Sequence, residues 1–177
     1  KGIDYFDEKG NNLRKTFLRS PLNFSRISSR YSKKRFHPVL KRYKSHLGTD
    51  YAAPRGTPIR SVADGVVTEA RRNRGNGIYV KIKHNNKYST QYLHMSKFAK
   101  KIKKGVRVTQ GQTIGYVGST GLASGPHVCF RFWKNGVQVD PYKQNDLPPG
   151  EPISQIHHNT FEYIRLKYLE KLKINLI

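Results

Sequence analysis

Short segments of β-forming residues, separated by glycines, fill the middle of this chain from residue 57 to residue 140. They are rich in valine, isoleucine, tyrosine, phenylalanine and threonine, which favour strands. The expected strands cover residues 58–62, 65–70, 78–84, 88–94, 113–117, 127–133 and 137–140. Asn135-Gly136 is a strong signal for a two-residue hairpin turn, and residues 84–87 are a weaker one. Because no long helical period interrupts this succession, the sequence predicts a mainly β fold, a compact antiparallel β-sheet domain.

The N-terminal part of the chain has a different character. Residues 1–30 predict a lead-in segment, the tail of an upstream domain, in which residues 5–18 pair as an extended hairpin around a turn at residues 7–10. Residues 29–45 are polar and basic, which is the composition of a loop. The folded domain is therefore expected to cover residues 31–147.

A linker and a helix are expected at the C-terminal end, over residues 148–177. Prolines and a glycine between residues 147 and 152 predict a stiff connection. Asn159 is placed to cap the helix, and Glu162 completes a capping box. The helix then carries apolar residues at helical spacing on one face: Phe161, Ile164, Tyr168 and Leu172. We expect this face to pack on the sheet or on a part of the protein outside this chain.

The charge of the chain is strongly positive. Lysine and arginine number 34 against 11 aspartates and glutamates, which gives a formal net charge of +23. Nucleic acid, an anionic membrane surface and an anionic wall polymer all fit such a surface. The chain begins at Lys1 without a methionine, so we expect a processed or truncated piece, from which any signal peptide or membrane anchor has been removed.

Three separate segments contain residues that bind metals or transfer protons. His46 and Asp50 precede a stretch with two prolines that excludes a long helix, so both are expected on an extended or turning segment. On a strand ending at His94, Tyr92 and His94 share a face and Leu93 turns to the core. Taken singly, a loop histidine with an Asx-turn aspartate and a strand-end surface histidine explain these segments equally well.

The third segment contains the single cysteine of the chain, Cys129. In a strand over residues 127–133, Val128 and Phe130 point into the core, while His127 and Cys129 lie side by side on the other face. For an isolated pair of this kind, a buried structural cysteine beside a surface histidine is the preferred interpretation. Imidazole, carboxylate and thiolate are nevertheless all zinc ligands, so the three segments together indicate a catalytic metal centre.

From about residue 5 to residue 152 the chain resembles the LytM/lysostaphin-type zinc metallopeptidases, which cut peptide bonds in bacterial peptidoglycan. The matching segments are residues 46–54, 56–59, 63–67, 92–96, 105–108, 111–121, 125–127 and 139–141. Several ordered, separated motifs make the resemblance specific. Residues 5–30 also look like the lead-in of Gram-negative envelope members, in which a larger upstream region precedes the peptidase domain.

The resemblance implies a role for each site residue. His46 and Asp50 would be zinc ligands, and His94 would be a catalytic imidazole. In the family's His-x-His motif the first histidine is catalytic and the second is the third ligand. His127 matches the first position, and Cys129 stands at the second, which is the one clear departure. A thiolate keeps the ligand set competent but makes the metal centre less positive than an imidazole would.

The implied function is zinc-dependent hydrolysis of peptidoglycan cross-links, at D-alanyl–diaminopimelate bonds. One of the two catalytic imidazoles would accept a proton from the attacking water, and the other would stabilise the oxyanion or protonate the leaving amine; the residues leave this division open. The expected partner is peptidoglycan, through its stem peptides, with an inhibitory upstream region or a regulator in addition. The expected location is the periplasm or cell envelope, with anchoring through an N-terminal segment outside this chain.

Two other functions compete with this one. A non-catalytic member of the same fold would bind the wall or activate an amidase, but such members lose several site residues, whereas here one position departs. A basic β-domain that binds nucleic acid would explain the charge but not the His/Asp/Cys set, and the aromatic RNA-binding signatures are missing. We therefore expect no specific nucleic-acid partner.

Overall fold

The computed structural model describes residues 6–12, 16–37, 40–144, 147 and 152–174. Contacts divide the chain into two compact units, a larger one over Phe17–Asn145 and a smaller one formed by Lys1–Thr16 with Asp146–Ile177. The domain boundaries at residues 30 and 147 stay a prediction.

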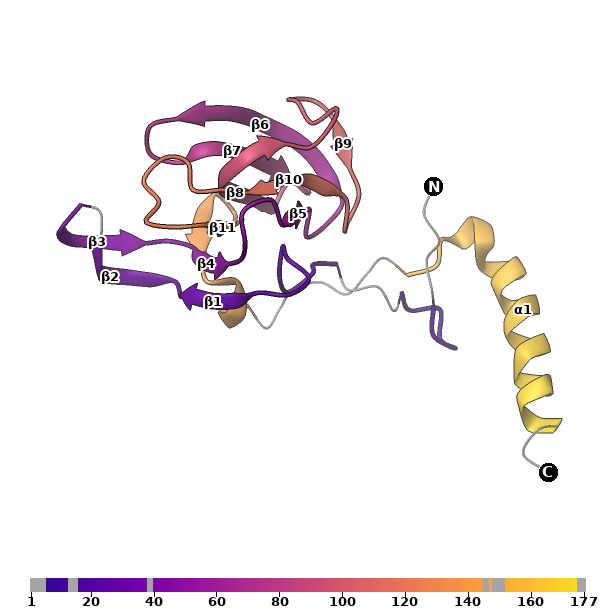
Figure 1. Ribbon diagram of the computed structural model, residues 1–177. Helices are drawn as coiled ribbons and strands as arrows, with labels where there is room; N and C mark the ends of the chain where they lie inside the picture. The colour runs from indigo at the N-terminus through magenta and orange to yellow at the C-terminus, as the bar shows by residue number, and fades with distance from the viewer. Residues whose placement is uncertain (1–5, 13–15, 38–39, 145–146, 148–151, 175–177) are drawn as a thin grey trace. The chain divides into compact units, whose positions relative to one another are not determined.

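The larger unit is built on an antiparallel sheet with the strand order β1-β4-β11-β8-β7-β6-β9 (Figure 1). These strands are β1 Arg26–Ser29, β4 Thr49–Ala52, β6 Gly65–Asn73, β7 Gly77–Lys83, β8 Tyr88–Phe98, β9 Arg107–Val108 and β11 His127–Lys134. Three more join them: β5 Pro58–Arg60 pairs with β10 Thr113–Val117, β10 pairs with β8, and β12 Val137–Val139 pairs with β11. A short 3-10 helix, η1, covers Pro141–Lys143. The prediction of a mainly β, antiparallel fold is confirmed.

The turn between β11 and β12 has the expected two-residue form. Lys134 pairs with Val137 across it, and Asn135 and Gly136 have φ of 51° and 78°. A type I′ turn needs positive φ at both central residues, which asparagine and glycine tolerate best. The sequence signal therefore predicted both the turn and the pairing of its two strands.

The prediction of a loop over residues 29–45 is wrong. Two strands, β2 Ser32–His37 and β3 Arg42–His46, form a separate two-stranded sheet in this region. The described side chains of this hairpin are exposed or half-buried, so it has no buried apolar face. The alternation of apolar and polar residues that reveals a half-buried strand is therefore missing, although the backbone pairing is present.

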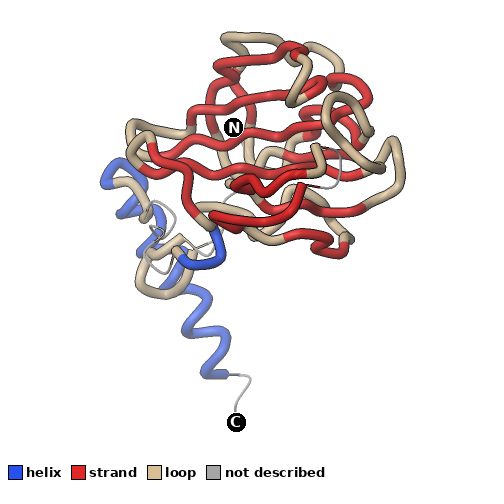
Figure 2. Tube along the Cα trace, turned by 90° about the vertical axis from the view of Figure 1, so that its left-hand side faces the viewer, coloured by secondary structure: helices blue, strands red, loops and turns tan. Residues whose placement is uncertain are grey.

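The core lies between the strands, and residues ahead of the sheet contribute to it. Phe130 and Phe132 of β11 are buried, as is Tyr92 of β8. Phe17 packs edge-on against Phe132, with ring centroids 5.2 Å apart, and Leu22 is also buried. Figure 2 shows the strands gathered around this interior. Part of the segment expected to be only a lead-in thus completes the core of the larger unit.

The smaller unit contains one long helix, α1 Gln155–Ile174. The expected cap at Asn159 is wrong, because Asn159 lies inside the helix, and Glu162 pairs with Arg165 at 2.7 Å instead of closing a capping box. The missed signal is Ser154, directly before the helix, because serine is a preferred N-cap residue. Of the predicted apolar face, Phe161 contacts Phe6, with ring centroids 6.3 Å apart.

The other three residues of that face, Ile164, Tyr168 and Leu172, are exposed, and the packing expected for them stays a prediction. Of the expected N-terminal hairpin, the described residues show an isolated bridge between Phe6 and Asn12. Residues 5 and 13–15 of that hairpin and residues 148–151 of the linker lie outside the described residues.

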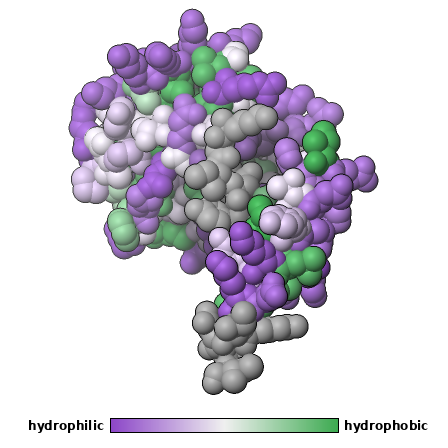
Figure 3. Space-filling view, turned by 90° about the vertical axis from the view of Figure 1, so that its right-hand side faces the viewer, coloured by the Kyte–Doolittle hydropathy of each residue, from purple (hydrophilic) through white to green (hydrophobic). Residues whose placement is uncertain are grey.

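The exposed side chains are mainly polar. Figure 3 shows one face of the molecule, which is mostly hydrophilic with scattered hydrophobic side chains. In the described part of the chain, no helix combines the length and the apolar character needed to cross a membrane.

Candidate metal centre

Three neighbouring strands bring His46, Asp50 and Cys129 together. His46 ends β3, Asp50 lies in β4, and Asp50 is directly opposite Cys129 in the antiparallel pairing of β4 with β11. The link between β3 and β4 passes close to β11 at Gly48, where an added Cβ would lie 2.8 Å from the carbonyl oxygen of Phe130. The prediction that His46 and Asp50 lie on an extended, non-helical segment is confirmed.

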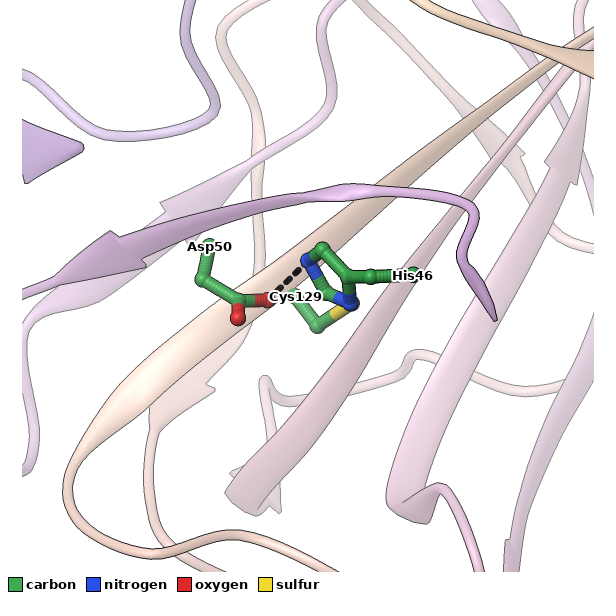
Figure 4. Close-up of side chains that lie close together, drawn as sticks. All are labelled: His46, Asp50 and Cys129. Atoms are coloured by element: carbon green, nitrogen blue, oxygen red, sulfur yellow. Dashed lines mark ion pairs between the residues drawn. The ribbon is translucent and has the colours of Figure 1, made fainter. Parts of the chain in front are cut away.

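The potential ligand atoms of these three side chains all lie within 4.8 Å of one another. Figure 4 shows the three side chains close together, with the carboxylate of Asp50 paired to the imidazole of His46. Around a tetrahedral zinc ion, ligand distances of about 2.0–2.3 Å place neighbouring ligand atoms about 3.3–3.8 Å apart. The geometry therefore needs only a small contraction to hold such an ion.

Two buried atoms of this group lack hydrogen bonds. Nε2 of His46 and Oδ1 of Asp50 lie 3.2 Å apart, yet neither has a hydrogen-bond partner. Buried polar atoms without partners are costly, and each such atom calls for an explanation. A cation held between nitrogen, oxygen and sulfur satisfies both atoms, so the donor set fits zinc.

Arg35 of β2 covers the outer side of the group. Its Nη2 lies 3.4 Å from Oδ2 of Asp50 and 3.0 Å from Nδ1 of His46, and its Nη1 donates to Oγ of Ser29 at 2.5 Å. A guanidinium group only donates, so Nδ1 of His46 accepts here. A neutral imidazole that binds zinc through Nε2 carries its proton on Nδ1, so this one contact must change when the metal binds.

The charges around Asp50 favour its ionised form. Burial raises the pKa of Asp50, but the adjacent imidazole of His46, with help from His127 and Cys129, brings that pKa below its usual value. Asp50 is only 6% exposed. A buried carboxylate of this kind is paired or coordinates a metal.

Cys129 is almost completely enclosed, with 3% of its surface exposed, and it clusters with Tyr79 and Leu93. Burial raises the pKa of the Cys129 thiol well above its usual range; Asp50 raises it further and Arg131 opposes the rise. At neutral pH the thiol therefore stays protonated unless a metal replaces its proton.

His94 reaches this group through an irregular backbone. It is a non-glycine residue with φ of 65°, in the left-handed region that side chains rarely adopt. The prediction that Leu93 turns to the core is confirmed, because Leu93 is fully buried and clusters with Tyr79 and Cys129. The prediction that Tyr92 and His94 share a face is wrong. Leu93 pairs with Cys129 and Tyr92 pairs with Phe130, so Tyr92 lies on the core face. The irregular residue breaks the alternation and returns His94 to the side of Cys129.

Thr120 fixes the His94 ring. Nδ1 of His94 donates to the carbonyl oxygen of Thr120 at 2.7 Å. The hydroxyl of Thr120 donates to the carbonyl oxygen of Met95 at 2.7 Å and accepts from the backbone N–H of Ile78 at 2.9 Å. An added Cβ at Gly77 would lie 2.3 Å from the Thr120 carbonyl oxygen, so this close approach requires a glycine. The loop before β11 is thereby tied to β7 and β8.

His127 stands beside His94, with ring centroids 4.7 Å apart. Its Nδ1 donates to the carbonyl oxygen of Gly125 at 2.8 Å, and its Nε2 lies 3.9 Å from Oδ1 of Asp50. Because carbonyl oxygens only accept, both histidines carry a proton on Nδ1 and are left with a lone pair on Nε2 when neutral.

One cavity of about 410 Å³ contains this whole arrangement. Its lining includes all five residues singled out in the sequence: His46, Asp50, His94, His127 and Cys129. Arg35 also lines the cavity; it stands in a run of basic residues, so no sequence pattern distinguishes it.

Because His94 is buried, the stability of the metal-free protein will depend on pH. Burial lowers the pKa of His94 to about 4, against about 6.5 in an unfolded chain. Between these values the unfolded chain binds more protons, so stability falls as the pH falls, by up to about 1.4 kcal/mol per pH unit. Urea unfolding of wild type and His94→Gln will show a flatter dependence in the variant between about pH 6.5 and pH 4. Parallel curves would contradict a neutral, buried His94.

The chain is similar to known peptidases over most of its length. A family profile described as "Peptidase family M23" matches residues 44–141. Peptidoglycan DD-endopeptidase ShyC of Vibrio cholerae is 44% identical over 170 residues, which cover 96% of this chain and 39% of that protein. The DD-carboxypeptidase/endopeptidase Mpg of Neisseria meningitidis is 44% identical over 137 residues, which cover 76% of this chain and 31% of that protein. The chain thus spans less than half the length of these relatives.

Solved structures show the same fold. A zinc-containing peptidase from Vibrio cholerae matches with a TM-score of 0.69 and 39% identity, over 82% of this chain and 44% of that one. The catalytic domain of the antimicrobial peptidase lysostaphin from Staphylococcus simulans matches with a TM-score of 0.58 and 27% identity, over 67% of this chain and 90% of that one.

Proposed function

Because this chain belongs to peptidase family M23, we propose that it is a zinc-dependent endopeptidase that hydrolyses the peptide cross-links of bacterial peptidoglycan. The observation that carries the proposal is the convergence of imidazole, carboxylate and thiol on one point, next to a pair of histidines in the same cavity. The names of similar proteins, among them peptidoglycan DD-endopeptidases, support this substrate. We propose the D-alanyl–diaminopimelate link as the bond that is cut.

His46, Asp50 and Cys129 are the proposed zinc ligands. Their donor atoms are a nitrogen, an oxygen and a sulfur, and three protein ligands leave a fourth position open, as in catalytic zinc sites. Zinc in this place supplies Lewis acidity toward water and toward a peptide carbonyl.

His94 and His127 provide the acid–base chemistry. Their Nδ1 atoms are held by backbone carbonyls, so each Nε2 can accept a proton. One ring takes a proton from the attacking water, and the other stabilises the developing oxyanion or donates to the leaving amine. The burial that lowers the pKa of His94 keeps this ring neutral, and therefore able to accept, at any pH above about 4.

The proposed setting is the periplasm or cell envelope. A net charge of +23 suits a protein that works close to anionic wall polymers or membrane surfaces. The relatives are more than twice as long as the matched part, which leaves room for an inhibitory upstream region in the whole protein. We also propose a regulator that acts on the cavity as a partner.

A direct test uses purified cross-linked muropeptide dimers. The metal-free chain and the same chain loaded with one equivalent of zinc are incubated with the dimers, and the products are separated by chromatography. We expect zinc-dependent release of monomers. A chain that binds no zinc at saturating metal, yet still binds sacculi, would instead support the non-catalytic wall-binding function.

Removing either catalytic imidazole will separate chemistry from metal binding. We expect His94→Ala and His127→Ala to retain one zinc per chain but to lose about 100- to 10,000-fold in kcat, since a general acid or base contributes about that factor. Zinc content by mass spectrometry and dimer hydrolysis measure the two properties. If either variant loses its zinc, the division into ligands and catalytic residues is incorrect.

A further inference from the structure

We propose that the hairpin β2–β3 forms a carboxylate-binding surface along the rim of the cavity, which holds the acidic groups of the cross-linked stem peptides. This inference rests on the proposed function and adds the chemical feature by which the substrate is selected. The hairpin projects beside β1 and β4, close to the strand that carries Asp50 (Figure 1).

Arg42 and Lys44 of the hairpin have no acidic partner among the described residues, whereas Arg35 is paired with Asp50. Residues 32–46 contain six lysines and arginines and no aspartate or glutamate. Arg35 pairs across the two strands with Lys44, and like charges directly opposite each other destabilise a sheet. Among the described residues, no carboxylate forms an ion pair with Lys44 or Arg42. An anion bound beside them therefore relieves their repulsion.

The two faces of the hairpin are distinct. Arg42, Lys44 and His46 alternate along β3 and so share one face. This face continues into the cavity, because His46 lines it and the guanidinium of Arg35 reaches both His46 and Asp50. Arg42 and Lys44 do not line the cavity themselves, but their face adjoins it at His46, on the rim that a long bound peptide would cross.

The opposite face carries aromatic residues. Phe36 and Tyr43 are 51% and 68% exposed, and their ring centroids are 5.7 Å apart. Nζ of Lys34 lies 5.5 Å from the centroid of the Tyr43 ring. Lys34 thus has the same charge as Lys44 on the same hairpin but points to the other side, which makes it a matched control.

The chemistry of the proposed substrate fits the basic face. Diaminopimelate carries a carboxyl group on the same carbon as the nitrogen of the cross-link. When the scissile bond lies in the cavity, that carboxylate is within reach of Arg35. The guanidinium of Arg35 has five N–H donors, and its contacts with Ser29, His46 and Asp50 leave donors for a substrate carboxylate. Lys44 lies directly opposite Arg35, and Arg42 follows about 7 Å farther along β3, so both can meet carboxylates farther along the stem.

The test compares two cross-linked dimers, one with free diaminopimelate carboxylates and one in which they are amidated. Zinc-loaded wild type, Lys44→Gln and Lys34→Gln are assayed for kcat/KM on both, and the metal-free proteins are titrated with both dimers by calorimetry. We expect wild type to prefer the free acid about tenfold, and Lys44→Gln to lose about threefold of this preference. Lys34→Gln retains it, and added salt weakens it in wild type.

The inference is overturned if wild type hydrolyses and binds the two dimers equally well. It is also overturned if Lys44→Gln and Lys34→Gln lose the same share of the preference for the free acid, because an equal loss indicates a non-specific effect of net charge. The calorimetric titration tests the carboxylate surface independently of the proposed hydrolysis. If wild type cuts neither dimer but binds the free acid more tightly, and Lys44→Gln alone loses that difference, the carboxylate surface stands and the hydrolase assignment fails.

Discussion

Replacing Asp50 by asparagine will remove both zinc binding and hydrolysis. The amide keeps the size of the side chain but loses the negative charge that the buried site directs at the metal. Changes to groups that only orient zinc ligands already cost about 10- to 100-fold in affinity or activity, so loss of a ligand should exceed about 100-fold in both. Zinc affinity is measured by competition with a chelator, and activity by release of muropeptide monomers.

Asp140→Asn is the matched control. Asp140 undergoes the same chemical change, but it caps η1, where its carboxylate accepts from the backbone N–H of Tyr142. We expect this variant to lose a little stability and to retain zinc and activity. An Asp50→Asn protein that still binds one zinc with wild-type affinity would remove Asp50 from the ligand set.

Replacing Cys129 by serine will have the second large effect. The serine hydroxyl keeps its proton at neutral pH and is a poor zinc ligand, so we expect zinc affinity to fall by more than about 100-fold. Cobalt substitution gives an independent measure, because a cobalt–thiolate bond produces an intense near-ultraviolet absorption. That absorption should be present in the wild type and absent from Cys129→Ser. If the variant binds zinc as wild type does, Cys129 is a packed side chain and not a ligand.

Cys129→His supplies the rescue and a test of charge. Zinc binding to the wild type must release the proton of a thiol whose pKa is raised, so affinity should increase about tenfold per pH unit near neutrality. With histidine at this position the increase should be much smaller. The thiolate also leaves the metal less positive, so the pH optimum of hydrolysis should be higher in the wild type than in the variant. An equal or lower wild-type optimum contradicts a thiolate ligand.

The regular parts of the fold could be predicted because their signals are local. The hairpin at Asn135-Gly136 depends on turn chemistry. The alternation in β11, where His127 and Cys129 line the cavity and Val128 and Phe130 do not, depends on a period of two. The convergence of His46, Asp50 and Cys129 followed from motif resemblance, since nothing in the residues themselves places β4 beside β11.

The errors occurred where tertiary contacts override local pattern. The hairpin β2–β3 carries no apolar period, so polar composition hid its strands and also hid Arg35. The left-handed conformation of His94 puts its side chain on the face opposite to that of Tyr92, which strict alternation along a strand does not predict. Both departures lie at the cavity, where irregular backbone is most often found.

The contacts of Thr120 have a consequence for how substrate entry and chemistry are linked. Its carbonyl determines which nitrogen of His94 holds the proton, while its hydroxyl fastens the loop to two strands. If the loop lifts to admit a bulky glycan-linked peptide, the imidazole loses the acceptor that sets its tautomer. The position of this loop and the tautomer of His94 are therefore coupled through a single residue, Thr120.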